Sequence, residues 1–417
     1  MTSEIINKKQ NYQISHSIVW IIYLIAYLAL GLLPAVKYSI PYIIAGSFAM
    51  LPMAIVSLKH KNYRMILIAL ATFGFFHGLL TYVTGNGVIT ELINEPVRYI
   101  RYFVPCLLFY IVSKMERKKQ IVVWIIASVL IGFVIIKTLI ALESDPMIAR
   151  TLARGVSDSD LMVYRMDNIG GFGNCYAVCI TFGLWVYLMF NSKLWMRIVS
   201  VIMLVFIFYF TIQAQYMIML LLCVLAFIAV VVLCAKKLST KILATLFVFC
   251  ILLLMPMLLR WIAGLGVEGE IYRKLINFAG VLDGTVALSD STSRIELYKA
   301  AFIDFIKSPI WGTWSSQVAN DSHSTILIIA STTGILGLCC YSYSVYKCYK
   351  VTRDTLVYNN VNTKIFAILF VVFLILALVN PIHYIYEISI VVFLYIPLTL
   401  MLFSEKVVVV RDDKKDI

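Results

Sequence analysis

Apolar segments of near-bilayer length dominate this chain of 417 residues. Twelve of them are found, at residues 17–36, 39–58, 63–83, 97–113, 120–142, 172–190, 195–212, 216–235, 240–260, 324–346, 363–380 and 384–403. A helix that crosses a bilayer needs about 20 consecutive apolar residues. With 62% hydrophobic and 14% charged residues, the chain carries more apolar surface than one soluble core uses. We therefore predict an all-α, polytopic integral membrane protein with about 12 transmembrane helices, in which residues 1–417 form a single membrane domain.

The distribution of charge predicts which side of the membrane each connection faces. With the N-terminus inside, most of the 35 Lys and Arg residues fall in inner connections and termini, and most of the 22 acidic residues fall outside. The inner connections carry Lys59, Lys61 and Arg64; Lys114, Arg117, Lys118 and Lys119; Lys193 and Arg197; and Lys347, Lys350, Arg353 and Lys364. Both termini are therefore predicted to be cytoplasmic. Because the basic residues are spread over short connections, the net charge of +13 indicates membrane orientation, and we expect no nucleic acid partner.

The longest polar interruption, residues 261–323, separates the ninth and tenth apolar segments and is predicted to be an extracytoplasmic loop. A long loop that is not of low complexity usually carries function. Ser293 and Glu296 have the spacing of a capping box, which predicts the start of a helix. The apolar residues that follow recur at helical spacing, and Pro309 ends the run. We predict an amphipathic helix at about 293–307 that lies on the outer membrane surface.

Charged and strongly polar side chains of the apolar segments gather at their outer ends. A charge inside a bilayer costs several kcal/mol and therefore needs a reason. The residues concerned are His77, Arg98, Arg101, Lys137, Gln213, Gln215, His383 and Glu387. The inner halves of the segments hold almost none. This asymmetry predicts a polar cavity that opens to the outside, whereas a transporter is expected to place its polar site near the membrane midplane.

Arginines in this outer region have the chemistry to bind a diphosphate. Arg98 and Arg101 are three residues apart, so they share one helix face. Arg165 and Arg294, from the outer loops, can approach the same ligand. Guanidinium stays charged and matches phosphate oxygens bidentately, which makes a diphosphate a better leaving group without a metal. The sequence offers no His-cluster metal site, and we expect no metal and no other cofactor.

His323 is the candidate general base, because imidazole ordinarily titrates near neutral pH and the residue precedes an apolar segment at its outer end. In that role it takes the proton from a sugar hydroxyl that attacks an anomeric carbon. Asp321 is a candidate orienting partner. Plainer roles stay open for all these residues: a cap near the tenth span for His323, a surface charge for Arg294, and snorkelling to lipid headgroups for the arginines and lysine within the spans.

Three stretches resemble motifs of the O-antigen polymerase and ligase superfamily. In SRIELYKAAFIDFIKSPIWG and DSHSTILIIASTTGILGL, an Arg opens an amphipathic helix, Pro-x-x-Gly follows, and a His precedes a span with Gly-x-x-Gly. These positions are Arg294, Pro309 with Gly312, His323, and Gly334 with Gly337. The stretch YRMDNIGGFGNCYA is similar to another family segment and gives Arg165, Gly171, Phe172 and Asn174. The expected topology agrees with the family over essentially the whole chain.

The resemblance implies a metal-independent, GT-C-like glycosyltransferase that uses an undecaprenyl-diphosphate-linked donor at the outer face of the bacterial inner membrane. His323 is then the catalytic base, and the diphosphate ligands are Arg98, Arg101, Arg165 and Arg294. Supporting roles fall to Asp321, Asn174, Lys137 and Gln215. The implied partners are the undecaprenyl-diphosphate-linked oligosaccharide, the lipid bilayer, and chain-length regulator and flippase proteins. The chain departs from the family at residues 213–215, where many relatives carry a basic residue after a Ser, and at Asp-Ser-His-Ser, where His-Asn is usual.

Among the functions considered, we favour a polymerase that joins lipid-linked repeat units into O-antigen or capsular polysaccharide. An O-antigen ligase, which moves the finished glycan to the lipid A core, shares the same motifs. A lipid-linked oligosaccharide flippase or similar transporter also has about twelve spans and a basic cavity, but it needs charges that reach the inner half of the membrane. A membrane O-acetyltransferase needs an inner acyl-CoA site with paired His, Asp and Arg, which the sequence does not supply.

Overall fold

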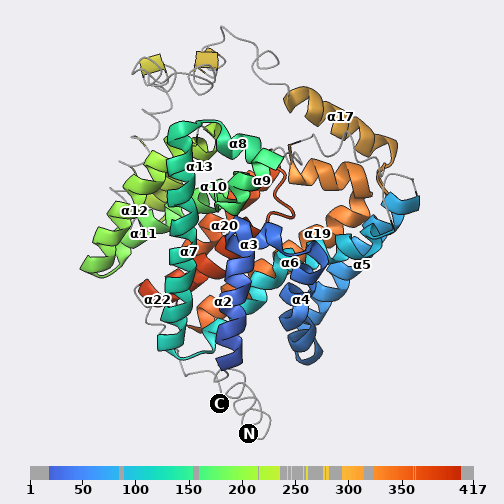
Figure 1. Ribbon diagram of the computed structural model, residues 1–417, viewed down its shortest axis with the longest axis horizontal. Helices are drawn as coiled ribbons and strands as arrows, with labels where there is room; N and C mark the ends of the chain where they lie inside the picture. The colour runs from blue at the N-terminus through green and yellow to red at the C-terminus, as the bar shows by residue number, and fades with distance from the viewer. Residues whose placement is uncertain are drawn as a thin grey trace, which may run out of the picture.

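The computed structural model describes residues 18–83, 89–153, 159–214, 216–234, 294–313, 323–359, 361 and 363–404, with isolated positions between 242 and 280. Within these residues all regular elements are helices (Figure 1). They are α2 Ile18–Leu32, α3 Pro34–Ser39, α4 Tyr42–Lys59, α5 Lys61–Val83, α6 Glu91–Ser113, α7 Arg117–Ser144, α8 Ile148–Ala153, α9 Ser159–Met166, α10 Phe172–Ile180, α11 Phe182–Asn191, α12 Leu194–Gln213, α13 Met217–Cys234, α17 Arg294–Lys307, α19 Thr325–Tyr358, α20 Thr363–Val379, α21 Tyr386–Ile390, the π-helical η1 Val391–Tyr395, and α22 Ile396–Phe403. The predicted all-α class is confirmed for this part of the chain.

The length and apolar character of the helices are those of a helical membrane protein. Six segments are long and apolar enough to cross a bilayer: Lys61–Val83, Arg117–Ser144, Phe172–Asn191, Leu194–Gln213, Thr325–Tyr358 and Tyr386–Phe403. Shorter apolar helices cover Val19–Leu32, Ile44–Val56, Ile218–Val232 and Thr363–Val379. The helix is the form in which a single segment satisfies its own backbone polar groups in lipid. The predicted segment 240–260 lies mostly outside the described residues, and the other predicted segments coincide with helices.

Several predicted segments are broken or longer in the structure. The first, 17–36, ends as α2 at Leu32, because Pro34 restricts Leu33 to an extended backbone and starts the short helix α3. The sixth, 172–190, divides into α10 and α11 at Thr181. The tenth, 324–346, continues as α19 to Tyr358 but is interrupted at Gly334, whose φ of 64° and ψ of −164° are not helical.

The C-terminal segment, α21–η1–α22, runs through the interior of the bundle. Of the residues in Tyr386–Phe403, 94% are buried. Helices α6 and α10 pack against its first part, and α7 packs against α22 (Figure 1). The side chains that follow Glu387 in this segment are apolar apart from Ser389, Tyr395 and Thr399, whose hydroxyls all make hydrogen bonds. This segment therefore supplies the core against which the polar elements described below are positioned.

A turn after α17 fits into the break of α19. The amide of Thr313 donates to the carbonyl of Ser331 at 2.8 Å, and the amide of Ile335 donates to the carbonyl of Pro309 at 2.8 Å. A Cβ on Gly312 would collide with the Thr332 backbone, and a Cβ on Gly334 would collide with the Ile310 backbone. Both glycines have positive φ, which other residues rarely adopt. The Pro-x-x-Gly turn and the Gly334 break are thus one structural unit.

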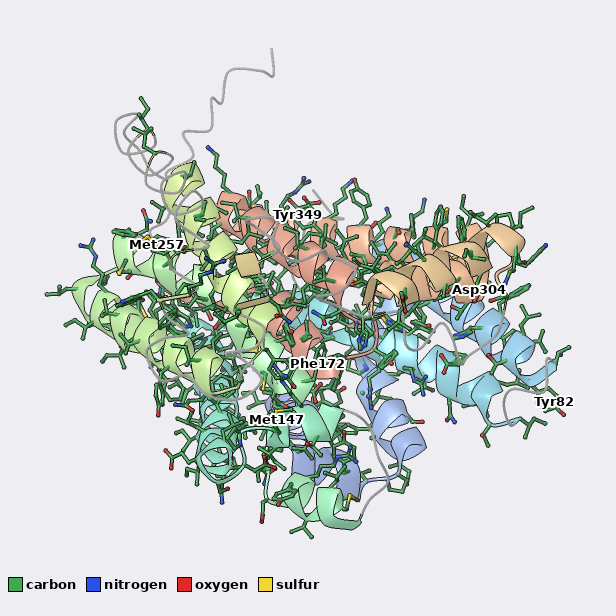
Figure 2. All side chains as sticks on the ribbon, turned by 90° about the horizontal axis from the view of Figure 1, so that it is seen from above. Tyr82, Met147, Phe172, Met257, Asp304 and Tyr349 are labelled. Atoms are coloured by element: carbon green, nitrogen blue, oxygen red, sulfur yellow. The ribbon has the colours of Figure 1, made fainter. Side chains whose placement is uncertain are left out.

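Helix α17 is present at Arg294–Lys307, as predicted from the apolar spacing. It lies along α19, as seen near the labelled Asp304 in Figure 2. Ala301 is buried, whereas Phe302, Ile303 and Ile306 are exposed. The proposed capping residue Ser293 falls outside the described residues.

We predict that Gly334→Ala and Gly312→Ala each destabilise the protein by at least about 1 kcal/mol, because each combines an unfavourable φ with a backbone collision. Gly132→Ala in α7 is the matched control, since a Cβ there meets nothing within 4 Å. It should be neutral or stabilising by up to about 1 kcal/mol. Thermal unfolding of the purified variants in detergent measures the difference. Wild-type midpoints for both test variants would contradict the tight packing of turn and break.

Candidate active site

Residues 380–385 connect α20 to α21, and together with the first two residues of α21 they form a segment that we call the 380–387 turn. This turn is bonded to the start of α19. The amide and the hydroxyl of Thr325 donate to the carbonyl of Asn380 at 3.1 and 2.9 Å. The hydroxyl of Thr325 in turn accepts from the amide of Ile382 at 2.7 Å. Asn380, Ile382 and Thr325 are all buried, so these bonds are shielded from water and hold the two segments together.

His323 lies immediately before this junction, and its backbone is strained. Its φ of 52° is in the left-handed region, which a residue with a Cβ adopts at a cost of about 1–3 kcal/mol. Ser324 then caps the N-terminus of α19, and its hydroxyl accepts from the amide of Leu327 at 3.4 Å. The junction with residues 380–382 therefore fixes the backbone of His323 in a costly conformation. Such strain gathers at functional sites.

Arg98 and Arg101 on α6 both face the 380–387 turn. The guanidinium of Arg98 lies 5.4 Å from the ring centre of Tyr384, and that of Arg101 lies 4.7 Å from the ring centre of Tyr386. Stacking on an aromatic face is favourable for a guanidinium. Arg101 is 7% exposed, whereas Arg98 is partly open. The two arginines that the sequence places on one helix face therefore lie against successive parts of one turn.

Glu95 is a buried partner of Arg98 that the sequence interpretation did not include. Its carboxylate lies 2.6 Å from Nη1 of Arg98 and 3.1 Å from Nδ1 of His77. The Tyr99 hydroxyl lies 3.3 Å from the same His77 nitrogen. Part of the charge of Arg98 is thus balanced within the protein. The spacing of Glu95 and Arg98, three residues apart on one helix, was the signal that could have revealed this pair.

His383 packs into the same group of side chains. Its ring stacks on Tyr99 with centres 6.2 Å apart and meets Tyr384 edge-on. Burial lowers the pKa of His383 to about 3, against the opposing effect of the Glu95 carboxylate. The imidazole is therefore neutral at physiological pH and a weak base, and its Nδ1 makes no hydrogen bond to the described residues.

Arg165 contacts α3, and α3 in turn is paired with Glu387 at the end of the 380–387 turn. Its guanidinium lies 4.3 Å from the ring centre of Tyr38, and the ammonium of Lys37 lies 5.6 Å from the same ring. Lys37 forms an ion pair with Glu387 at 2.7 Å. The amide of Ala35 donates to Oδ1 of Asn168 at 3.1 Å and ties α3 to the segment between α9 and α10. Lys37 was not among the predicted site residues.

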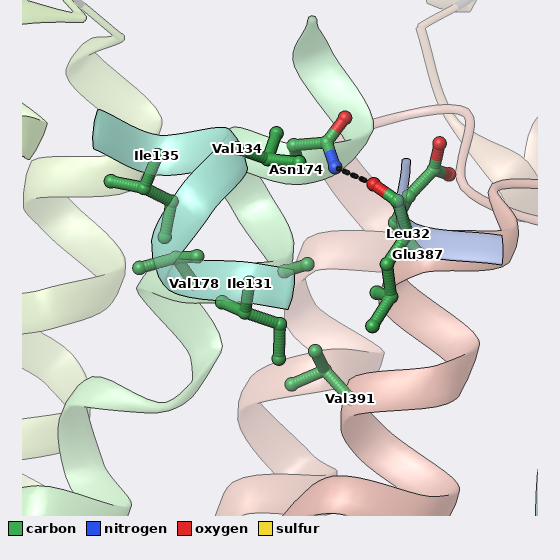
Figure 3. A pocket seen from close by; sticks show the side chains of 9 residues that line it. Leu32, Ile131, Val134, Ile135, Asn174, Val178, Glu387 and Val391 are labelled. Atoms are coloured by element: carbon green, nitrogen blue, oxygen red, sulfur yellow. Dashed lines mark hydrogen bonds between the residues drawn. The ribbon is translucent and has the colours of Figure 1, made fainter. Parts of the chain in front are cut away.

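Asn174, in the first turn of α10, shares a small pocket with Glu387. Its Nδ2 donates to the carbonyl of Leu32 at 3.4 Å. Figure 3 shows the amide of Asn174 and the carboxylate of Glu387 at one end of the pocket and aliphatic side chains at the other. The remaining lining residues are Ile131, Val134, Ile135, Ala177, Val178 and Val391. Asn174 thus belongs to the side of the turn that carries Lys37 and Arg165.

The other predicted residues do not join this group or are not described. Lys137 is exposed on α7 beside the exposed Ile136 and Ile140, so it does not face the pocket that Val134 and Ile135 line. The structure therefore does not bring Lys137 into this group, and its predicted supporting role stays a prediction. Gln215 and Asp321 lie outside the described residues. Arg294 is the first residue of α17, and only its backbone is described.

The geometry places four cations around two carboxylates on one side of the bundle. Arg98 is paired with Glu95, and Lys37 with Glu387, whereas Arg101 and Arg165 stack on tyrosines. An excess of positive charge next to aromatic and amide groups suits an anion with several oxygens. No family model matches the chain, and no curated protein matches its sequence.

We predict that Arg98→Ala destabilises the protein by about 3 kcal/mol, because it leaves the buried Glu95 carboxylate without its closest partner. Arg165→Ala is the comparison, since it removes a cation–π contact of about 1 kcal/mol or less. The double variant Arg98→Ala/Glu95→Gln should recover most of the loss. Chemical denaturation in detergent micelles provides the measurement. Equal losses for the two single variants would show that Arg98 does not compensate a buried charge.

Proposed function

We propose that this protein is a glycosyltransferase that polymerises undecaprenyl-diphosphate-linked oligosaccharide repeat units into O-antigen or capsular polysaccharide. In this proposal the chain has twelve membrane spans with both termini in the cytoplasm, and residues 261–323 lie outside the bacterial inner membrane. One observation carries the proposal: the 380–387 turn meets Arg98 and Arg101 directly, reaches Arg165 through the Glu387–Lys37 pair, and is bonded to the strained backbone next to His323.

The proposed reaction is a direct displacement at an anomeric carbon. The arginines bind the diphosphate of the growing chain and stabilise the negative charge that develops on it. His323 takes the proton of a hydroxyl on the incoming lipid-linked repeat unit as that oxygen forms its bond to the anomeric carbon. The bond between the anomeric carbon and the diphosphate oxygen breaks, and its electron pair leaves with undecaprenyl diphosphate. The proton then passes from His323 to solvent.

The distribution of polar groups supports an enzyme over a transporter. The charged side chains surround the 380–387 turn, whereas α21–η1–α22 below it is buried and mostly apolar. A translocation path for a charged glycolipid needs polar groups deeper in the membrane.

The ligase alternative uses the same donor chemistry and differs in its acceptor. Purified protein that extends lipid-linked repeats alone is a polymerase, one that requires lipid A core is a ligase, and translocation without bond formation indicates a flippase.

We predict that His323→Asn abolishes polymer while the single repeat unit stays attached to its lipid. Asparagine tolerates positive φ, so this variant removes the imidazole and keeps the backbone conformation. His60→Asn, in the connection between α4 and α5, is the matched control and should retain polymer. Gel analysis of the polysaccharide from a complemented deletion strain, at equal expression, gives the readout. Wild-type polymer from His323→Asn would refute its role as the base.

The arginine at the start of α17 is tested in the same strain. We expect Arg294→Ala to abolish polymer and Arg294→Lys to restore only part of it, because lysine lacks the bidentate geometry of guanidinium. Polymer at the wild-type level from Arg294→Ala would remove this residue from the proposed diphosphate site and leave the other arginines unaffected.

A further inference from the structure

The ion pair between Lys37 and Glu387 joins residues 350 positions apart in the chain. Lys37 lies in the last turn of α3, and Glu387 lies in the first turn of α21. The ammonium and Oε1 are 2.7 Å apart, and the side chains are 26% and 7% exposed. A buried carboxylate is costly, and one ion pair seldom offsets that cost by itself. The pair therefore needs an explanation beyond joining two helices.

The carboxylate of Glu387 lies against the start of α10. A Cβ on Gly173 would lie 2.9 Å from Oε2 and 2.6 Å from Cγ2 of Ile385, so the absence of a side chain at Gly173 leaves space for this carboxylate. Oε2 is buried and makes no hydrogen bond to the described residues. The 2.7 Å ion pair with this buried carboxylate restrains the position of the Lys37 ammonium. Lys37 is therefore preorganised, which a solvated lysine is not.

The ammonium of Lys37 retains capacity for a ligand. A lysine has three N–H donors, and Oε1 of Glu387 takes one of them. A quarter of the side chain remains exposed. Arg165 stacks on Tyr38, the residue after Lys37, and Arg101 stacks on Tyr386, the residue before Glu387. The ion pair thus lies between two tyrosines that each carry a guanidinium on the ring, and the excess of positive charge in this region favours a polyanion.

We propose that Lys37 is a further ligand of the lipid diphosphate and that Glu387 is the residue that positions it. This inference rests on the proposed function, because it assigns two more residues to the same substrate. The sequence signal was weak, since Lys37 is a lone cation between the first two apolar segments. The geometry distinguishes it from the exposed Lys137, which faces outward on α7.

The first test measures ligand binding rather than turnover. The purified full-length chain in detergent is titrated with farnesyl diphosphate, and with farnesol as the uncharged probe. Lys37→Met keeps the aliphatic stem and should weaken binding of farnesyl diphosphate at least about tenfold, as expected for a lost charge-assisted hydrogen bond. Lys37→Arg should bind within about threefold of wild type, because the charge remains. Farnesol affinity should not change in either variant.

The second test examines Glu387. If Glu387 positions Lys37, Glu387→Gln weakens binding of farnesyl diphosphate although it makes the site more positive. If the carboxylate acts only as a neutralising charge, the same variant binds more tightly, and that outcome overturns the positioning role. The reversed pair Lys37→Glu/Glu387→Lys restores an ion pair between α3 and α21. Recovery of wild-type affinity in this double variant would also overturn the proposal, because a purely structural link would then suffice.

The outcomes separate this inference from the proposed function. If wild-type protein binds farnesyl diphosphate no better than farnesol, the diphosphate site itself fails. If wild type prefers the diphosphate and Lys37→Met binds it equally well, only the role of Lys37 fails. Thermal midpoints of all variants, measured in the same detergent, show whether each one is folded.

Discussion

The hydrogen bonds between Thr325 and the 380–387 turn are the interaction on which the rest of the site depends. They join the start of α19 to the connection between α20 and α21, and they use backbone groups that would otherwise be buried without partners. A single threonine side chain both donates and accepts here. Through it, the backbone next to His323 and the surroundings of Arg98 and Arg101 acquire a fixed relation.

Around this junction the protein places its charged groups in compensated pairs and stacks. Glu95 and Glu387 are buried, and each accepts a hydrogen bond from a basic side chain, Arg98 and Lys37 respectively. The remaining guanidinium groups lie over tyrosine rings. Such an arrangement reduces repulsion between cations before an anion binds, and it keeps those cations in position. The low polarity of the surrounding helices strengthens each of these interactions.

The sequence predicted the helices well, because the length of a membrane helix is set by the bilayer and appears directly as apolar runs. It also predicted that Arg98 and Arg101 share a face, since helical spacing fixes that relation. It did not predict the roles of Lys37, Glu95 or the break at Leu33. Those depend on contacts between distant segments, such as the pair of Lys37 with Glu387, which no local pattern contains. The exposed position of Lys137 on α7 could not be predicted either, because an isolated lysine in an apolar run has the same sequence appearance whether it faces the interior or the lipid.

The turn that follows α17 is bonded into the break of α19 at Gly334, eleven residues beyond His323. Backbone hydrogen bonds therefore connect the end of α17 directly to the middle of α19. The first turns of α19 are bonded in turn to the 380–387 turn through Thr325. A displacement of α17 would thus be transmitted both to the backbone beside His323, the proposed base, and to the turn that Arg98 and Arg101 face.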